Sequence, residues 1–238
     1  MLNTHTFNRF ELKYLVRQRV IPEFLGELAG YLRPDPNATG PWGYPVFSAY
    51  WDSDAFALFW EKIEGLKYRR KLRFRRYGDE PFVFIEIKQR TDRTLQKRRA
   101  RWPLTRTVAA FGPDSDHGPI QPDDPIVSEA LVLKHRFRLR PRMAISYRRR
   151  AYFGVYEPDL RVTFDHRVLY RATEVDIARP VRSGRDLIDP RLAIMEVKFD
   201  ERVPTWLGKA VRRHGFQMVR LSKYCSAVDR TYFGNTLT

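Results

Sequence analysis

The feature that most constrains the fold is an alternation of charged and apolar residues within short segments of the chain. In RRKLRFRRYG, which begins at Arg69, the cations Lys71, Arg73 and Arg75 alternate with leucine and phenylalanine. Successive side chains of a β-strand point to opposite faces of a sheet. The segment is therefore predicted to be a strand with a cationic face, and not a disordered basic tail. The same alternation recurs in FELKY, FIEIKQR, YRRRAY, LRVTFD and IMEVKF.

The periodicity of the whole chain predicts an α+β fold. Strands are expected at 7–16, 46–52, 67–78, 81–90, 94–104, 140–154, 160–171 and 192–200, and helices at 20–32, 57–65, 127–137, 204–215 and 222–233. Ser222 is the expected N-cap of the last helix. The strands do not alternate regularly with helices, so an antiparallel barrel or large sheet with peripheral helices fits best. Residues 1–238 are read as one domain, with 112–125 as an internal loop.

Composition narrows the classes of function. The 44 Lys and Arg residues outnumber the 28 Asp and Glu residues, giving a formal net charge of +16, which predicts a polyanionic partner. No apolar run reaches the ~20 residues of a membrane span, and the N-terminus lacks the pattern of a signal peptide. A single cysteine, Cys225, excludes an internal disulfide and a multi-cysteine zinc site. A cytoplasmic location is the expectation.

A Glu-x-Lys pattern occurs on three predicted strands, at 11/13, 86/88 and 196/198. Any one such strand is explained by an ordinary solvent-exposed face. Several rows of like charge on neighbouring strands, however, repel one another and call for an anion. Closing the sheet would turn the rows inward and form a cationic tunnel containing a few carboxylates. That composition suits phosphoryl transfer, in which cations and Mg²⁺ or Mn²⁺ neutralise phosphate oxygens.

These segments together resemble a known family. RFELKY, SAYWD, KLRFRRYG, FIEIKQR, YRRRAY, LRVTFD, MEVKF and LSKYC occur in the order found in the vacuolar transporter chaperone (VTC) domain, from about Arg9 to Val228. That domain belongs to the triphosphate tunnel metalloenzyme superfamily and is similar to the catalytic domain of polyphosphate polymerases. The resemblance implies an eight-stranded antiparallel tunnel with peripheral helices, ATP as phosphoryl donor, and a growing polyphosphate chain. The chain looks like the stand-alone bacterial form.

The resemblance also implies roles for residues that match the family's motifs. The expected catalytic cations are Arg73, Arg75, Lys88, Arg149, Arg161 and Lys198. Lys13, Lys71, Lys223 and Tyr147 are expected to bind the phosphates. Glu196 is the expected main ligand of Mn²⁺ or Mg²⁺, joined by Glu11 and Glu86, and Asp165 either orients a cation or assists at the metal.

Three other functions stay open at this stage. Hydrolases of the superfamily look like E-x-E-x-K on the first strand, whereas Arg9 stands at the first acidic position here, which favours a polymerase or binding role over triphosphate hydrolysis. A non-catalytic module that binds polyphosphate is the main alternative. Nucleic acid, stacked on aromatic residues such as Trp42, Trp51 and Phe74, is the least favoured partner.

Overall fold

A computed structural model describes residues 10–38, 40–92, 94–112, 122–179 and 183–234. The chain divides into two compact units, each assembled from three segments. Unit 1 comprises Met1–Pro45, Tyr147–Val168 and Asp186–Leu221, and unit 2 comprises Val46–Ser146, Leu169–Arg185 and Ser222–Thr238. Arg9 and most of the predicted loop 112–125 lie outside the described residues. The single domain over 1–238 stays a prediction.

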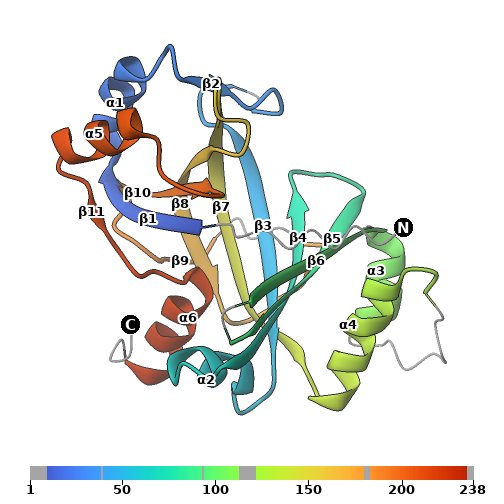
Figure 1. Cartoon of the computed structure of the whole chain (residues 1–238). Helices are drawn as coiled ribbons and strands as arrows, with labels where there is room; N and C mark the ends of the chain where they lie inside the picture. Colours follow the sequence, from blue (N-terminus) through green and yellow to red (C-terminus); the bar gives the residue numbers. More distant parts are fainter. Residues whose placement is uncertain (1–9, 39, 93, 113–121, 180–182, 235–238) are drawn as a thin grey trace. The chain divides into compact units, whose positions relative to one another are not determined.

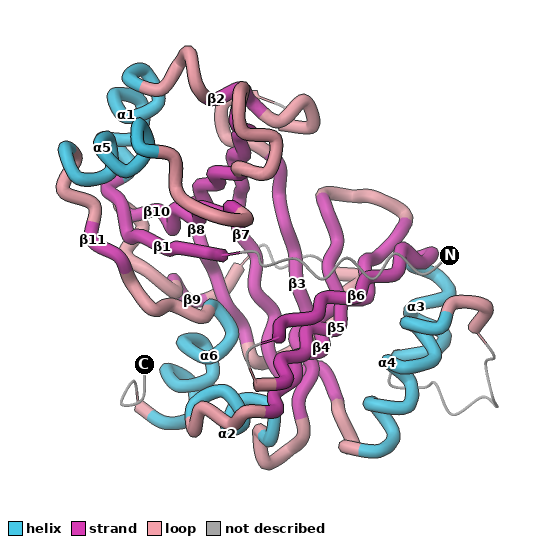
Figure 2. The backbone as a smooth tube through the Cα atoms, viewed as in Figure 1, coloured by secondary structure: helices cyan, strands magenta, loops and turns pink. Residues whose placement is uncertain are grey.

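The described residues form eleven strands and six α-helices (Figures 1 and 2). The strands are β1 (Phe10–Arg17), β2 (Leu32–Pro34), β3 (Tyr44–Asp52), β4 (Tyr68–Tyr77), β5 (Phe82–Thr91), β6 (Thr94–Pro103), β7 (Arg140–Gly154), β8 (Arg161–Arg171), β9 (Arg185–Asp186), β10 (Leu192–Phe199) and β11 (Gln217–Met218). The helices are α1 (Ile21–Glu27), α2 (Ala57–Ile63), α3 (Leu104–Phe111), α4 (Pro125–Arg136), α5 (Thr205–Arg213) and α6 (Lys223–Val228). In the described part of the chain, no helix has the length and apolarity needed to cross a membrane.

The α+β class and the large sheet are confirmed, but the sheet is not a closed barrel. Its strand order is β11-β1-β10-β8-β7-β3-β4-β5-β6, with β2 and β9 as side branches. Within the described residues this order has two ends, β11 and β6. Charged side chains on an edge strand discourage further pairing, and β6 contains the run KRRAR. The eight predicted strands match the eight longest ones. The additional strands have two or three residues, too few to show an alternation.

In unit 1 the apolar core forms where α1 and α5 pack against one face of β1, β8 and β10. Phe24 of α1 and Leu207 of α5 are fully buried with Val162, Phe164 and Met195 of the strands. The rings of Phe24 and Phe164 meet edge to face, with centroids 6.3 Å apart. Because alternate strand residues face opposite ways, this core leaves the charged residues of β1, β8 and β10 on the other face.

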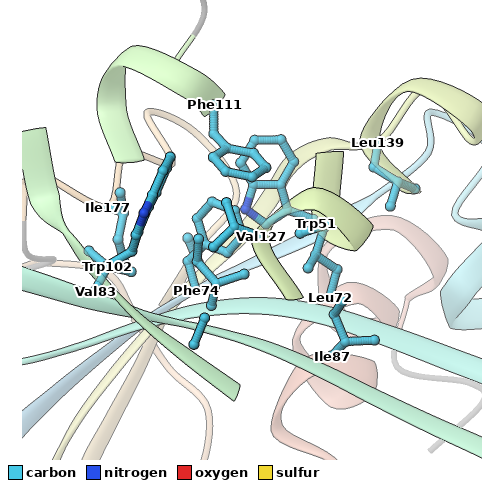
Figure 3. Packing of buried hydrophobic residues seen from close by; sticks show 14 of the residues in the cluster. Trp51, Leu72, Phe74, Val83, Ile87, Trp102, Phe111, Val127, Leu139 and Ile177 are labelled. Carbon is cyan, nitrogen blue, oxygen red and sulfur yellow. The ribbon is translucent and has the colours of Figure 1, made fainter. Parts of the chain in front are cut away.

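In unit 2 the core lies between the strands and helices α3 and α4. Figure 3 shows Trp51, Phe74 and Phe111 packed together, and the Phe74 and Phe111 rings lie 4.7 Å apart at nearly a right angle. Helix α3 was not predicted from the sequence, because its segment follows a strand directly and begins with Leu-Thr after Pro103. This core occupies the face of β4 and β5 that carries leucine, phenylalanine and isoleucine.

Two arginines on this apolar face correct a prediction. The alternation of side chains along the strand places Arg70 and Arg76 on the face opposite Lys71, Arg73 and Arg75. On that face they are expected to be ordinary surface residues. Arg76 is instead buried and donates hydrogen bonds to the carbonyl oxygens of Glu80 and Ala178. Arg70 is largely buried and forms an ion pair with Glu61. The helical layer covers this face, so its charged residues need internal partners.

Candidate functional site

The structure collects the predicted site residues other than Lys223 into two groups, one in each unit. The unit 1 cluster consists of Glu11, Lys13, Tyr147, Arg149, Arg161, Asp165, Glu196 and Lys198. The unit 2 cation face consists of Lys71, Arg73, Arg75, Glu86, Lys88, Lys97, Arg99 and Arg101, on β4, β5 and β6. Each group occupies the strand face opposite the apolar core of its own unit.

Two Glu-x-Lys strands face each other in the unit 1 cluster. β1 and β10 are antiparallel, and their register places Glu11 opposite Lys198 and Lys13 opposite Glu196. Lys13 Nζ lies 3.0 Å from Glu11 Oε1 and 3.9 Å from Glu196 Oε1, while Lys198 Nζ lies 3.2 Å from Glu196 Oε2. Lys198 Nζ is also 3.9 Å from Glu11 Oε2. The four side chains therefore form a square in which each charge has opposite charges beside it.

Arg149 is buried beside this square and contacts one of its glutamates, Glu196. Its Nε and Nη2 donate to the two carboxylate oxygens of Asp165 at 2.6 and 2.8 Å, and Nη2 also donates to Glu196 at 3.2 Å. Burial alone would lower the pKa of the Arg149 guanidinium, but the charges of Asp165 and Glu196 raise it well above its ordinary value. Such a bidentate pair fixes the orientation of the guanidinium. Asp165 therefore orients a cation, one of its two expected roles.

Arg161, Tyr147 and Thr163 complete this face of unit 1. Arg161 Nη2 donates to Asp35 at 3.3 Å and to the Tyr44 hydroxyl at 3.2 Å. The Tyr147 ring is buried beneath Arg149, whose guanidinium carbon lies 5.2 Å from its centroid. Thr163 pairs with Glu196 across β8 and β10, and its buried hydroxyl finds no hydrogen-bond partner among the described residues.

The register of β4, β5 and β6 arranges the unit 2 cation face in rows. One row contains three lysines, because Lys71 lies opposite Lys88 and Lys88 lies opposite Lys97. The remaining rows are Arg73–Glu86–Arg99 and Arg75–Phe84–Arg101. Including the flanking Arg69 and Arg90, this face has four cations on β4, two on β5 and three on β6. Glu86 is the one carboxylate that these strand sequences contain, so the face is strongly positive.

Glu86 neutralises only part of that charge. It accepts a hydrogen bond from Arg73 Nε at 2.8 Å, and Lys97 Nζ lies 2.7 Å from its other oxygen. Burial would raise the pKa of the Glu86 carboxyl, but Arg73, Arg75 and Lys97 hold it well below its ordinary value. Glu86 is thus ionised and shared by cations. This environment differs from that of Glu11 and Glu196, the other expected metal ligands.

The strand β3 and helix α6 support the same face of unit 2. Arg75 Nε donates to Ser48 at 3.2 Å, and Arg73 Nη1 donates to the Tyr50 hydroxyl at 3.2 Å. Burial would raise the pKa of the Tyr50 hydroxyl, but Arg73, Arg75 and Lys223 lower it. Lys223 is buried, so its side chain does not simply point into solvent.

Helix α6, which carries Lys223, is anchored at its N-terminus. The Ser222 side chain accepts from the backbone N–H of Cys225, as predicted for an N-cap, and also from Lys71 Nζ at 3.0 Å. The Tyr224 hydroxyl donates to Asp52, and its ring stacks on Tyr50 with centroids 5.1 Å apart. These contacts fix the position of Lys223 in unit 2.

No three Asp, Glu, His or Cys side chains form a potential metal centre among the residues that the structure describes. Of the three expected ligands, Glu11 and Glu196 belong to the square in unit 1, whereas Glu86 belongs to unit 2. Within unit 1, therefore, two of the expected ligands lie together. Any ion in the unit 1 cluster would be held by two carboxylates together with oxygens from its substrate.

Sequence reasoning missed several residues of these groups. The cation face is extended by three residues of β6: Lys97, Arg99 and Arg101. The alternation of strand faces along QKRRARW would have identified them. Arg98 masks the pattern, because it points to the helical layer and pairs with Glu129 there. Tyr50 and Ser48 carried no signal, since uncharged polar residues are common on any strand.

Comparison with known proteins identifies the family. The VTC domain family matches residues 8–232, so the chain belongs to the VTC domain family and the predicted family is confirmed. Among curated proteins, none matches this chain in sequence.

Solved structures confirm the fold. A candidate adenylate cyclase from Bacillus halodurans is 15% identical, with a TM-score of 0.57 over 93% of this chain and 96% of that chain. A candidate adenylyl cyclase from Hippeastrum, described as having a dominant triphosphatase activity, is 13% identical with a TM-score of 0.51 over the same shares. At these identities the likeness concerns the fold alone.

Proposed function

We propose that this protein transfers the terminal phosphoryl group of a nucleoside triphosphate, with ATP as the expected donor, to a growing polyphosphate chain. Membership of the VTC domain family supports this function. The observation that carries it is the row Lys71–Lys88–Lys97, three like charges held side by side on adjacent strands. Such a row is unfavourable by itself and becomes favourable when a linear polyanion lies across it.

The unit 2 cation face would hold the phosphate groups. Arg73 and Arg75 have their guanidinium orientation set by Glu86 and Ser48, and preoriented cations stabilise the charge that develops on transferred phosphoryl oxygens. Lys71, Lys88 and Lys223 would bind neighbouring phosphates along the chain. In unit 1, Arg149, Arg161, Lys13 and Lys198 are the proposed partners of phosphate oxygens, with Tyr147 supporting Arg149.

The unit 1 cluster fits a hard divalent cation such as Mn²⁺ or Mg²⁺. Glu11 and Glu196 share the same two lysine neighbours, and the orphaned hydroxyl of Thr163 lies on the strand beside Glu196. Glu196, with Glu11, would hold the ion together with substrate oxygens. When bound, the ion supplies positive charge that polarises a phosphoryl oxygen. The proposed role of Glu86 becomes neutralisation of Arg73 and Lys97 rather than metal binding.

Triphosphate hydrolysis is the second candidate, favoured by the fold shared with the Hippeastrum protein and its triphosphatase activity. Hydrolysis requires a group that orients or deprotonates water. In the unit 1 cluster, Glu11, Asp165 and Glu196 each contact a lysine or arginine. These contacts support transfer to phosphate over activation of water.

Purified protein incubated with ATP and Mn²⁺ tests the proposal, with polyphosphate and free phosphate measured separately. We expect polymer to accumulate, and to fall at least tenfold in Lys88→Ala and Glu196→Gln. The exposed Arg140→Ala variant is the control, since its pairing with Asp54 lies at the surface. Free phosphate without polymer would establish hydrolysis instead. Tight tripolyphosphate binding without turnover, unchanged in Glu196→Gln, would establish a binding module.

A further inference from the structure

The unit 2 cation face changes character along its strands. Next to the lysine row comes Glu86 with its arginines, and beyond that the side chains become aromatic. Phe82 and Phe84 of β5 lie on this face with ring centroids 5.6 Å apart, and Tyr77 of β4 approaches Phe84 at 5.6 Å. One end of the face is therefore purely cationic, and the other combines aromatic rings with arginines.

Two arginines of β6 stack on these rings. The guanidinium carbon of Arg99 lies 3.5 Å from the ring centroid of Phe84, and that of Arg101 lies 3.5 Å from the centroid of Phe82. Both arginines reach diagonally across to the adjacent strand, since Arg99 is directly opposite Glu86 and Arg101 is directly opposite Phe84. Both are exposed, and β6 is the last strand of the sheet order (Figure 1). Each pair thus presents a planar guanidinium group with one face against a phenylalanine ring.

We propose that Arg99 and Arg101 form a stacking platform for the base of the donor nucleotide. A guanidinium plane stacks on aromatic rings and nucleobases alike. Phe82 and Phe84 cover the inner faces of the two guanidinium groups, which leaves their outer faces for a base. This inference rests on the proposed function, because it takes the lysine row as the binding place of the phosphates.

The spacing sets the orientation of the nucleotide. Lys88 and Phe84 are four residues apart on β5, which corresponds to about 13 Å along an extended strand. This length is comparable to that between the base and the terminal phosphate of an extended nucleoside triphosphate. The terminal phosphate would lie at the lysine row, where an acceptor polyphosphate also binds, and the base would lie over the stacked arginines.

The stack also predicts the pattern of selectivity. Stacking without hydrogen bonds to base edges accepts any base, because every base has a π-face. We therefore expect ATP and GTP to bind with similar affinity. Both should bind more tightly than tripolyphosphate once the difference in ligand charge is taken into account. The platform distinguishes a nucleotide from an inorganic chain, and does not distinguish one purine from another.

The test compares ATP with tripolyphosphate by isothermal titration calorimetry on the full chain. In the double variant Arg99→Lys/Arg101→Lys the charge is kept while the planar stack is lost. We expect the ATP dissociation constant to rise about fivefold or more relative to that of tripolyphosphate. Arg106→Lys is the matched control, since Arg106 also lies over an aromatic ring, Trp102, which belongs to the buried core.

The possible outcomes separate this inference from the proposed function. An unchanged ratio of the two dissociation constants in the double variant overturns the platform while the phosphate site stands. Failure of the wild-type protein to bind either ligand overturns the proposed function itself. Single-stranded oligonucleotides that displace tripolyphosphate, and that weaken in the double variant, would show that the stack serves nucleic acid and would likewise overturn the inference. Thermal unfolding confirms that the variants fold.

Discussion

The two units use the same local sequence in opposite ways. In unit 1, Glu11-x-Lys13 and Glu196-x-Lys198 lie on antiparallel neighbours, so each glutamate faces a lysine. In unit 2, the lysine of Glu86-x-Lys88 lies between Lys71 and Lys97. The first arrangement neutralises itself, and the second concentrates positive charge.

This difference teaches that a charged strand pattern acquires its meaning from its neighbours. Glu-x-Lys facing an antiparallel Glu-x-Lys produces complementary pairs, which stabilise a sheet. Glu-x-Lys between two strands rich in arginine and lysine produces a surface that needs an anion. Unit 1 therefore holds its charged residues in a largely neutralised arrangement, while unit 2 presents an excess of positive charge.

The largest effect on stability should come from removing the buried Arg149 guanidinium, which contacts Asp165 and Glu196 in unit 1. Arg149→Met leaves Asp165 fully buried without its guanidinium, and we expect the free energy of unfolding to fall by about 3–5 kcal/mol. Arg161→Met, whose side chain is about a third exposed at 31%, should cost about 1 kcal/mol or less. Urea unfolding measures both. Equal losses in the two variants would contradict the view that unit 1 depends on internal neutralisation.

A smaller effect should follow from removing the carboxylate of unit 2. Glu86→Gln leaves Arg73 and Lys97 without their counter-charge, and should lower stability by about 1–3 kcal/mol at neutral pH. The pKa of Glu86 is lowered by folding, so its contribution is complete above the unfolded value near ~4.3 and is lost as pH falls through the folded pKa.

Stability curves of wild type and Glu86→Gln should therefore run parallel above about pH 5 and converge in acid. The exposed Glu80→Gln variant, in the turn after β4, is the control and should follow wild type throughout. A gap between wild type and Glu86→Gln that stays constant down to the lowest accessible pH would show that the side chain acts through packing.

The smallest effect distinguishes the two lysine environments. Lys88→Ala removes one charge of the row Lys71–Lys88–Lys97 and should change stability in either direction by no more than about 0.5 kcal/mol at low salt. Lys13→Ala removes complementary contacts and should lower stability by about 0.5–1 kcal/mol. Thermal unfolding at two salt concentrations measures both changes. If the two variants lose equal stability, the contrast between the units is wrong.

The sequence predicted each strand well, but not the pairing of strands that lie far apart in the chain. Alternation is a local property, so the faces of β4, β5, β8 and β10 follow from spacing alone. Register depends on contacts between distant segments, and the square of Glu11, Lys13, Glu196 and Lys198 requires two strands more than 180 positions apart. The same limitation led to the expectation of a closed barrel, because local patterns do not say which strands lie at the edges.

For the candidate site, parity identified the cations that share a face but not their partners. Arg76 was expected at the surface, because a strand gives no sign of the helical layer that covers it. The contributions of Tyr50 and Ser48 depend on β3 lying beside β4, which the sequence did not indicate. The β6 arginines were hidden because charged residues occupy both faces of that strand. Sequence patterns therefore predicted which residues share a strand face, while tertiary packing determined the partners of those residues.

The assembly of each unit from distant segments has a consequence for folding during synthesis. β1 is synthesised early, yet its partner β10 lies far along the chain, and Lys13 bonds to the carbonyl of Leu221. Unit 2 likewise receives α6 from the last segment, with Tyr224 bonding to Asp52. Neither unit can therefore finish folding while its C-terminal segment is still within the ribosome. Until those segments emerge, the nascent chain carries β1 without its partner strand β10, and Lys71 without its contact to Ser222.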